Sequence, residues 1–372
     1  MRRFLAFLLF TFSFAASAQG VSATEIVIGQ TGGFTGPVAT QVKEMTAGAL
    51  LYLEHINATG GVNGRKIRLE SMDDGFLPPR AGANAKVLIE EKKVFALFLV
   101  RGTPHTEAVL PHARKAGVPV IAPSTGAGIL HDPVDPLIFN VRSKYQDEAE
   151  KAVVQLATQG IKQVVVIHVD DSFGKDGLKG YEKGFKAAGI TPAGIFSFDR
   201  TTGDSKDAVA KALALQPQAV VTAGSGKHVV AILRALRAAN STASLITLSN
   251  NSSQGFIKDL GEDGNGTIVM QVFPDPRRTG IAINTEMQRL AANKKDFAVS
   301  HIAMEGFAAA KVLVEGLRRA GKNPTHASFV TGLESIKNFD LGGLTISFSP
   351  TDHTGLSFVE ASVINKRGTF TQ

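Results

Sequence analysis

Two short turns, rich in glycine and hydroxyl side chains, follow two neighbouring hydrophobic segments of the chain. The first turn holds Gly102 and Thr103, and the second holds Ser124, Thr125 and Gly126. Hydroxyl and backbone N–H groups donate hydrogen bonds, and glycine lets a ligand approach the backbone closely. A small anion, most simply a carboxylate, suits such donors. The alternative is that these residues only cap the starts of two helices.

The segments before these turns are predicted to be buried parallel strands. Residues 95–100 (FALFLV) and 118–122 (VPVIA) are apolar without polar alternation, as in strands covered on both faces. A short helix is expected between them, at 107–116. The carboxyl ends of parallel strands share one sheet edge, where helix N-termini expose N–H groups and partial positive charge to a common crevice. We therefore expect both turns to face one binding site.

Strands and helices alternate along most of the chain in two similar sets. The first set, over residues 24–122, reads as strand, helix, strand, helix, strand, helix, strand, and a second set covers residues 149–249. Long helices are expected further on, at 280–294 and 299–320, and strands and turns at the end. This alternation predicts an α/β fold of two doubly wound parallel-sheet lobes.

The N-terminus predicts export. Residues 1–18 combine two arginines, an apolar run and small residues before Gln19, which is the pattern of a signal peptide cleaved after Ala18. That run is too short for a membrane span and no later one approaches twenty residues, so the mature protein is expected to be soluble. The chain has no cysteine. An exported protein of this length must therefore rely on its core rather than on disulfides.

Charge and motifs favour neither nucleic-acid binding nor catalysis. The formal net charge is +7, but basic residues are scattered among acids without interleaved aromatic residues. A phosphate loop fails near Gly224, because Val221 replaces its first glycine and His228 replaces its magnesium-binding hydroxyl. His105 and His112 are expected on the surface of the 107–116 helix. No metal or cofactor is predicted, and the enzyme alternative is a cryptic Ser/His/Asp site.

Five segments, in order and spread over nearly the whole mature chain, carry a family resemblance. They are IVIGQTGGFTGPVA (26–39), INATGGVNGRKIRLESMDD (56–74), GVPVIAPSTGA (117–127), HVDDSFGKDG (168–177) and HIAMEGFAAAKVLVEGL (301–317). With these segments the chain resembles the type I periplasmic solute-binding proteins of ABC importers, in the branched-chain amino acid (Leu/Ile/Val) branch. The Gly-Gly-Val-Asn-Gly-Arg-Lys block is the most distinctive match.

The resemblance implies two lobes that close on a small ligand, without chemistry or a cofactor. It implies a periplasmic protein, monomeric by default, that delivers its ligand to a permease and ATPase complex in the membrane. Three crossing strands would join the lobes, near residues 140–145, 270–274 and 346–350. The implied lobe one is 24–143 plus 275–347, and the implied lobe two is 144–274 plus 348–372.

The resemblance also implies ligand-binding residues. In relatives that bind branched-chain amino acids, two lobe-one turns hold the ligand carboxylate, and these match Gly102 and Thr103 together with the 124–126 turn. A lobe-two aromatic residue closes over the ligand, at the place of Phe173. Gln41 stands in place of an aromatic residue of the first turn. Tyr145, beside the first crossing, is predicted either to reach the ligand or to pack in the core.

Two departures from the family pattern concern the ligand's ammonium group. Relatives hold it with a tyrosine and a glutamate, where this chain has Ser225 and either Asn250 or Asn251. A buried ammonium without its counter-charge costs on the order of 3–5 kcal/mol, which is roughly two to three decades of affinity. A tight site for a free amino acid therefore needs another carboxylate, or the ligand has no ammonium.

Two charged residues are candidates to complete the site. Glu305 is the candidate replacement acid, and the alternative is a solvated helix residue or a partner of Arg318 or Lys311. Arg101, next to the first turn, is a candidate to bind a second acid group, and the alternative is pairing with surface acids.

Three functional hypotheses follow from this sequence. The first is a receptor of an ABC importer for an aliphatic amino acid or amide. The second is the same kind of receptor for another small carboxylate, such as an aromatic or keto acid. The third is a sensory ligand-binding subunit without transport.

Overall fold

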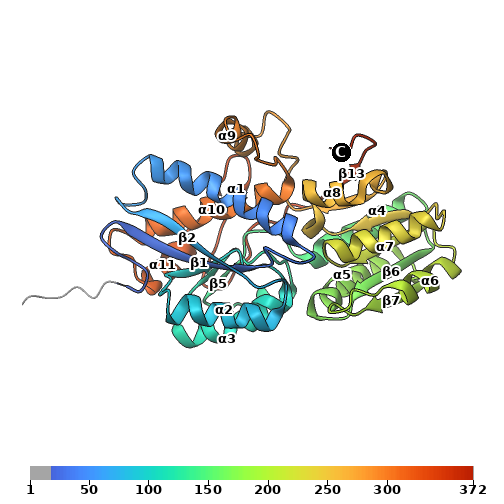
Figure 1. Cartoon of the computed structure of the whole chain (residues 1–372), viewed down its shortest axis with the longest axis horizontal. Helices are drawn as coiled ribbons and strands as arrows, with labels where there is room; N and C mark the ends of the chain where they lie inside the picture. The colour runs from blue at the N-terminus through green and yellow to red at the C-terminus, as the bar shows by residue number, and fades with distance from the viewer. Residues whose placement is uncertain (1–17, 372) are drawn as a thin grey trace, which may run out of the picture.

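The computed structural model describes residues 18–371, and these form two α/β lobes placed side by side along the long axis of the molecule (Figure 1). The α/β fold class with parallel-sheet lobes is confirmed. The predicted signal peptide lies outside the described residues, apart from Ala18. In the described part of the chain, no helix has the length and apolar character needed to cross a membrane.

Lobe one surrounds a five-stranded parallel sheet with the order β2-β1-β3-β4-β5. Its strands are β1 (Glu25–Gly32), β2 (Lys66–Asp73), β3 (Ala96–Phe98), β4 (Val120–Ile121) and β5 (Ile138–Phe139). Its helical elements are α1 (Ala39–Ala58), α2 (Pro78–Glu90), α3 (Thr103–Ala116), η1 (Gly128–Leu130), α9 (Ala282–Ala291), α10 (His301–Arg319) and α11 (His326–Glu334). A small ribbon pairs β11 (Phe339–Asp340) with β12 (Thr345–Ile346). Helices α1 and α10 cover one face of the main sheet, and α2 and α3 cover the other (Figure 1).

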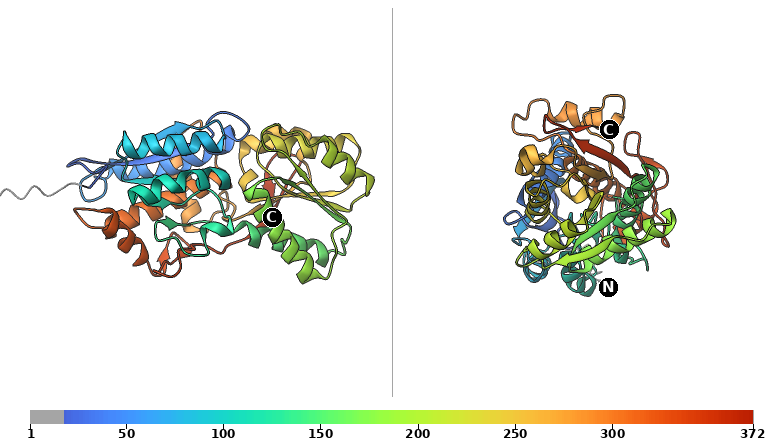
Figure 2. Two further views of the ribbon diagram at one scale, coloured as in Figure 1. Left: turned by 90° about the horizontal axis from the view of Figure 1, so that it is seen from below. Right: turned by 90° about the vertical axis from the view of Figure 1, so that its right-hand side faces the viewer.

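Lobe two surrounds a seven-stranded sheet with the order β14-β13-β10-β9-β8-β6-β7, in which β13 and β14 are antiparallel. Its strands are β6 (Val164–Val169), β7 (Gly194–Phe198), β8 (Ala219–Ala223), β9 (Ser244–Thr247), β10 (Ile268–Gln271), β13 (Glu360–Ile364) and β14 (Phe370–Thr371). Its helical elements are α4 (Tyr145–Thr158), α5 (Ser172–Ala188), α6 (Lys206–Ala214), α7 (Lys227–Ala238), η2 (Ser249–Asn251), α8 (Gln254–Leu260) and η3 (Gly261–Gly264). Figure 2 shows α4 and α5 on one side of this sheet and α6 and α7 on the other.

The helix that starts at the first turn begins earlier than the sequence predicts. Helix α3 starts at Thr103 rather than at Glu107, because Gly102 adopts a φ of 99° and Pro104 stands in the first turn. Proline is favoured there, since its missing N–H would have no intrahelical partner. The helix ends at Gly117, whose φ of 64° is a left-handed stop. The early start places Thr103 directly at the sheet edge.

The lobes are joined where residues 140–143 run beside a later segment. Asn140 pairs with Thr354 in a parallel bridge, and Val141 accepts a hydrogen bond of 2.9 Å from the N–H of Leu356. Phe348 and Leu356 both belong to the hydrophobic core of lobe one. The prediction of a crossing at 346–350 is therefore wrong, because the chain stays with lobe one for several more residues.

Candidate functional site

The structure brings the two hydroxyl-rich turns together at the carboxyl edge of the lobe-one sheet. The N–H of Gly102 donates to the carbonyl of Ser124 at 3.3 Å, and Arg101 and Ser124 form a parallel bridge just beyond β3 and β4. The Oγ1 atoms of Thr103 and Thr125 are 2.7 Å apart and share a hydrogen bond. The side chains of Arg101, Thr103, Ser124 and Thr125 are all buried. The edge therefore presents a compact set of hydroxyl and guanidinium groups.

Glycine is required at Gly102 and at Gly126 for different structural reasons. A Cβ on Gly102 would lie 2.7 Å from Nδ1 of His105, and the positive φ already disfavours other residues. A Cβ on Gly126 would lie 2.5 Å from the carbonyl oxygen of Ser143. Gly126 thus packs against the first crossing strand, and its carbonyl accepts a hydrogen bond from the N–H of Tyr145 at 2.8 Å.

Arg101 reaches from lobe one to lobe two. Its side chain donates to Oγ of Ser124 at 2.8 Å and to the backbone carbonyl of Asn250 at 2.7 Å. The residue is only 2% exposed, so the alternative of pairing with surface acids is wrong. Among residues 18–371, no carboxylate lies within ion-pairing distance of this guanidinium. Burial lowers the pKa of Arg101, as expected for a cation removed from water.

Glu305 also belongs to the polar cluster that Arg101, Thr103, Ser124 and Thr125 form. It lies on α10 and is 4% exposed, and its Oε1 accepts a hydrogen bond of 2.6 Å from Oγ of Ser124. The alternative of a solvated acid or a partner of the two basic residues is wrong, since Lys311 pairs with Glu286 and Arg318 lies near Glu315. Ser124 accepts from Arg101 and gives its one hydroxyl proton to Glu305.

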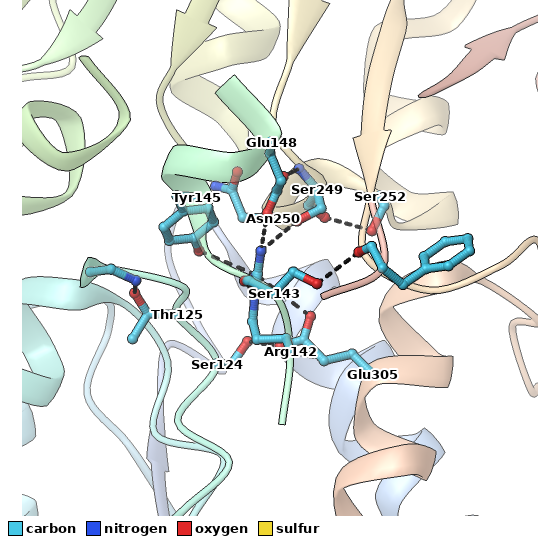
Figure 3. Close-up of polar contacts among 12 residues, drawn as sticks. Ser124, Thr125, Arg142, Ser143, Tyr145, Glu148, Ser249, Asn250, Ser252 and Glu305 are labelled. Carbon is cyan, nitrogen blue, oxygen red and sulfur yellow. Dashed lines mark hydrogen bonds and ion pairs between the residues drawn. The ribbon is translucent and has the colours of Figure 1, made fainter. Parts of the chain in front are cut away.

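A second buried arginine, which sequence reasoning missed, lies in the segment at 140–143 that joins the lobes (Figure 3). Arg142 forms an ion pair with Glu148 of α4 and donates to Oγ of Ser249 at 2.7 Å. Its Nη1 lies 3.8 Å from Oε2 of Glu305 in lobe one. Glu148 also accepts the N–H of Ser249 at 2.8 Å. Burial raises the pKa of Glu148 to about 7, while Arg142 and Ser249 act to lower it.

The predicted lobe-two residues lie around these arginines. The ring of Tyr145 stacks under the guanidinium of Arg142, 4.3 Å from its centroid, and meets Phe173 edge-on at 4.8 Å. Nδ2 of Asn250 donates to Oγ of Ser225 at 2.9 Å. Within the described residues, Oδ1 of Asn250 has no hydrogen-bond partner, although it is buried.

Of the two asparagines left open by the sequence, Asn250 is the one that faces the cluster. The side chain of Asn251 is used within lobe two, where Oδ1 accepts from the N–H of Gly226 at 2.8 Å and Nδ2 donates to Thr247 at 2.8 Å. Asn250 instead meets Arg101 through its carbonyl. Asn251 therefore shapes the loop that carries Asn250.

Gln41 is the candidate residue that makes no hydrogen bond with the other candidates in the described chain. It lies in the first turn of α1, where its side-chain oxygen accepts from Oγ1 of Thr40 at 2.9 Å. No hydrogen bond within the described chain joins Gln41 to another candidate residue. The side chain of Gln41 is nevertheless buried.

One histidine prediction is wrong. His105 is fully buried and stacks on Phe76 with ring centroids 4.4 Å apart, instead of lying on the surface. Burial lowers its pKa to about 3, so the ring is neutral. Among residues 18–371, no group of three or more metal-ligating side chains is placed to hold a metal ion.

The comparison with known proteins identifies the family. A family model described as periplasmic binding protein matches residues 25–365. The chain belongs to this family. Its members are solute-binding proteins rather than enzymes, as the names of the relatives also indicate.

Three relatives of this periplasmic binding protein illustrate the match. The Leu/Ile/Val-binding protein homolog 3 of Brucella melitensis is 27% identical, covering 92% of this chain and 93% of the relative. A substrate-binding periplasmic protein from Ralstonia solanacearum is 30% identical, with a TM-score of 0.87 over 94% of this chain and 99% of that one. A possible leucine/isoleucine/valine-binding protein from Rhodopirellula baltica shares the fold, with 24% identity, a TM-score of 0.88, and coverage of 96% and 98%.

Proposed function

We propose that this periplasmic binding protein is the receptor of an ABC importer for a small organic carboxylate without an ammonium group. It binds the carboxylate between its lobes and delivers it to a permease and ATPase complex. The observation that carries this proposal is Arg101, a buried guanidinium between the lobes that lacks an acidic partner in the described chain. A buried cation without its counter-charge is costly, and a ligand carboxylate removes that cost.

The state of the two buried acids supports a ligand without an ammonium. Glu148 is engaged by Arg142 and by both donors of Ser249. Glu305 accepts from Ser124 and lies near Arg142. An ammonium would have to share one of these carboxylates with a partner that it already has.

The remaining groups fit the rest of such a ligand. The hydroxyl pair of Thr103 and Thr125 adds one free donor beside Arg101, and the rings of Tyr145 and Phe173 offer apolar contact. The free Oδ1 of Asn250 accepts from a hydroxyl group of the ligand where one is present. Aliphatic, aromatic and keto acids all match this set.

A branched-chain amino acid is the second candidate, and the names of the relatives favour it. In that case Oε2 of Glu305 would receive the ammonium, while Oε1 keeps its hydrogen bond from Ser124. A sensory role without transport is the third candidate. The neighbouring genes decide between the two roles: a permease and an ATPase would indicate transport, and a kinase would indicate sensing.

A matched ligand pair tests the proposal. Thermal unfolding of the mature chain is measured with leucine, with the keto acid that carries the leucine side chain, with benzoate, and with leucine amide. A ligand at a hundred times its Kd stabilises by about 2.7 kcal/mol. We expect the keto acid or benzoate to raise the midpoint and leucine amide to leave it unchanged. A rise with leucine but not with its keto acid would refute the proposal.

A further inference from the structure

The lobes also meet along a contact outside the candidate site, which we call the seam. Its members on lobe one are Pro37, Thr40 and Glu44, and those on lobe two are Gly226, Lys227, Gln254 and Gly255. The lobe-one members lie on the loop before α1 and on its first turns. The lobe-two members belong to the starts of α7 and α8.

Glu44 makes the central polar contact of the seam. Its two carboxylate oxygens accept from the N–H of Gln254 at 3.0 Å and from the N–H of Gly255 at 2.8 Å. The first N–H groups of a helix have no partner within the helix, so these donors need one from elsewhere. The side chain of Ser253, which caps the same helix, accepts a hydrogen bond from the N–H of Phe256 instead. Glu44 therefore satisfies two donors of the opposite lobe.

The backbone of the seam fits closely. A Cβ on Gly255 would lie 2.4 Å from Cβ of Thr40 in the other lobe. A Cβ on Gly226 would lie 2.0 Å from the carbonyl oxygen of Pro37, and that carbonyl accepts the N–H of Lys227 at 3.0 Å. Glycine at these two places allows the lobes to approach to this distance.

None of the twelve candidate ligand-binding residues is a member of the seam. We propose that Glu44 is a positioning residue that sets ligand affinity from outside the cleft by stabilising the closed arrangement of the lobes. The apparent Kd of a ligand that needs the closed arrangement rises in proportion as that arrangement becomes less populated. This proposal does not depend on the chemistry of the ligand.

Two variants weaken the seam in different ways. Glu44→Ala removes the acceptor of both N–H groups. Gly255→Leu keeps the helix but places a side chain where Thr40 lies when the lobes are closed. The matched controls are Glu54→Ala, an exposed acid of the same α1 helix that pairs with Lys294, and Lys258→Leu, an exposed position of α8.

The experiment measures the distance between the lobes without ligand. Because the chain has no cysteine, spin labels can be attached at two introduced cysteines, replacing the exposed Glu91 of lobe one and Glu262 of lobe two. The chain is unfolded and refolded to remove bound small molecules, and distances are read by double electron–electron resonance. We expect the Glu44 and Gly255 variants to raise the ratio of open to closed molecules by about tenfold to a hundredfold, and the controls to match the parent chain.

Two results would overturn the proposal. One is an unchanged distance distribution in Glu44→Ala, whatever Gly255→Leu does, and the other is equal opening in the Glu54 control. Circular dichroism and the unfolding midpoint establish that each variant is folded. Because no ligand is added, failure here leaves the carboxylate proposal intact, and failure of the ligand screen leaves the seam result intact.

Discussion

Replacing Arg101 by methionine gives the most direct test of the carboxylate site. The substitution keeps an unbranched side chain of similar reach but removes the buried guanidinium between the lobes. We expect the variant to lose most of its affinity for carboxylate ligands. We also expect its unfolding midpoint without ligand to stay equal or to rise, because the parent buries this cation without an acidic partner in the described chain.

The size of the expected loss follows from the contacts. A carboxylate replacing Ser124 and the carbonyl of Asn250 as acceptors would receive up to two hydrogen bonds from Arg101. Each hydrogen bond to a charged group contributes about 1.5–3 kcal/mol. Two of them correspond to roughly two to four decades in Kd, at about 1.4 kcal/mol per decade.

Isothermal titration with the best carboxylate from the thermal screen measures this change. The matched control is Arg114→Met, which removes an exposed arginine of the same lobe that pairs with Asp135 at 2.7 Å. The control should bind like the parent chain. If Arg101→Met binds within threefold of the parent, or loses stability while keeping its affinity, Arg101 is a structural residue and the site has been misassigned.

Two further predictions concern stability. Glu148→Gln leaves Arg142 without its closest acid, so the free energy of unfolding should fall by about 3–5 kcal/mol in urea at pH 8, and a loss under 1 kcal/mol would argue against a buried ion pair. His301 is buried edge-on against Phe370, and burial lowers its pKa to about 3. The unfolded chain then binds the extra proton between pH 6.5 and 3, so stability should fall as the pH drops through this range, by up to about 1.4 kcal/mol per pH unit for this residue. His301→Phe should reduce that slope, and an unchanged slope would exclude burial of His301 as its cause.

Local signals allowed the fold and the position of the two turns to be predicted from the sequence. The uninterrupted apolar runs at 95–100 and 118–122 indicated neighbouring buried strands, and β3 and β4 pair in parallel within these runs. The position of Thr103 and Ser124 at one sheet edge follows from that pairing. Such inferences succeed because each depends on a few adjacent residues and on the fixed geometry of parallel strands.

The contacts between distant residues could not be predicted in the same way. Arg101 meets a carbonyl 149 positions later, and Ser124 meets an acid 181 positions later. No periodicity links such positions, because the distance between them depends on how the lobes close. The sequence left the burial of Arg101 and Glu305 open for this reason, since a charged residue is exposed in most proteins unless it has a partner.

The balance of charge across the cleft connects the sequence departures with the structure. Where the family resemblance places a glutamate for the ligand's ammonium, this chain has Asn250 or Asn251, and the lobe-one acid Glu305 is linked to Arg101 through Ser124. The backbone carbonyl of Asn250 accepts a hydrogen bond from the buried guanidinium of Arg101. Arg142 is matched by Glu148 and lies near Glu305, which leaves Arg101 as the cation without a direct acidic partner in the described chain. The departure from the family pattern and the buried arginine both support our proposal that the site holds an anion. A low-dielectric cleft makes that difference large, because an unmatched charge is far more costly there than in water. A ligand carboxylate would supply the direct acidic partner that Arg101 lacks in the described chain.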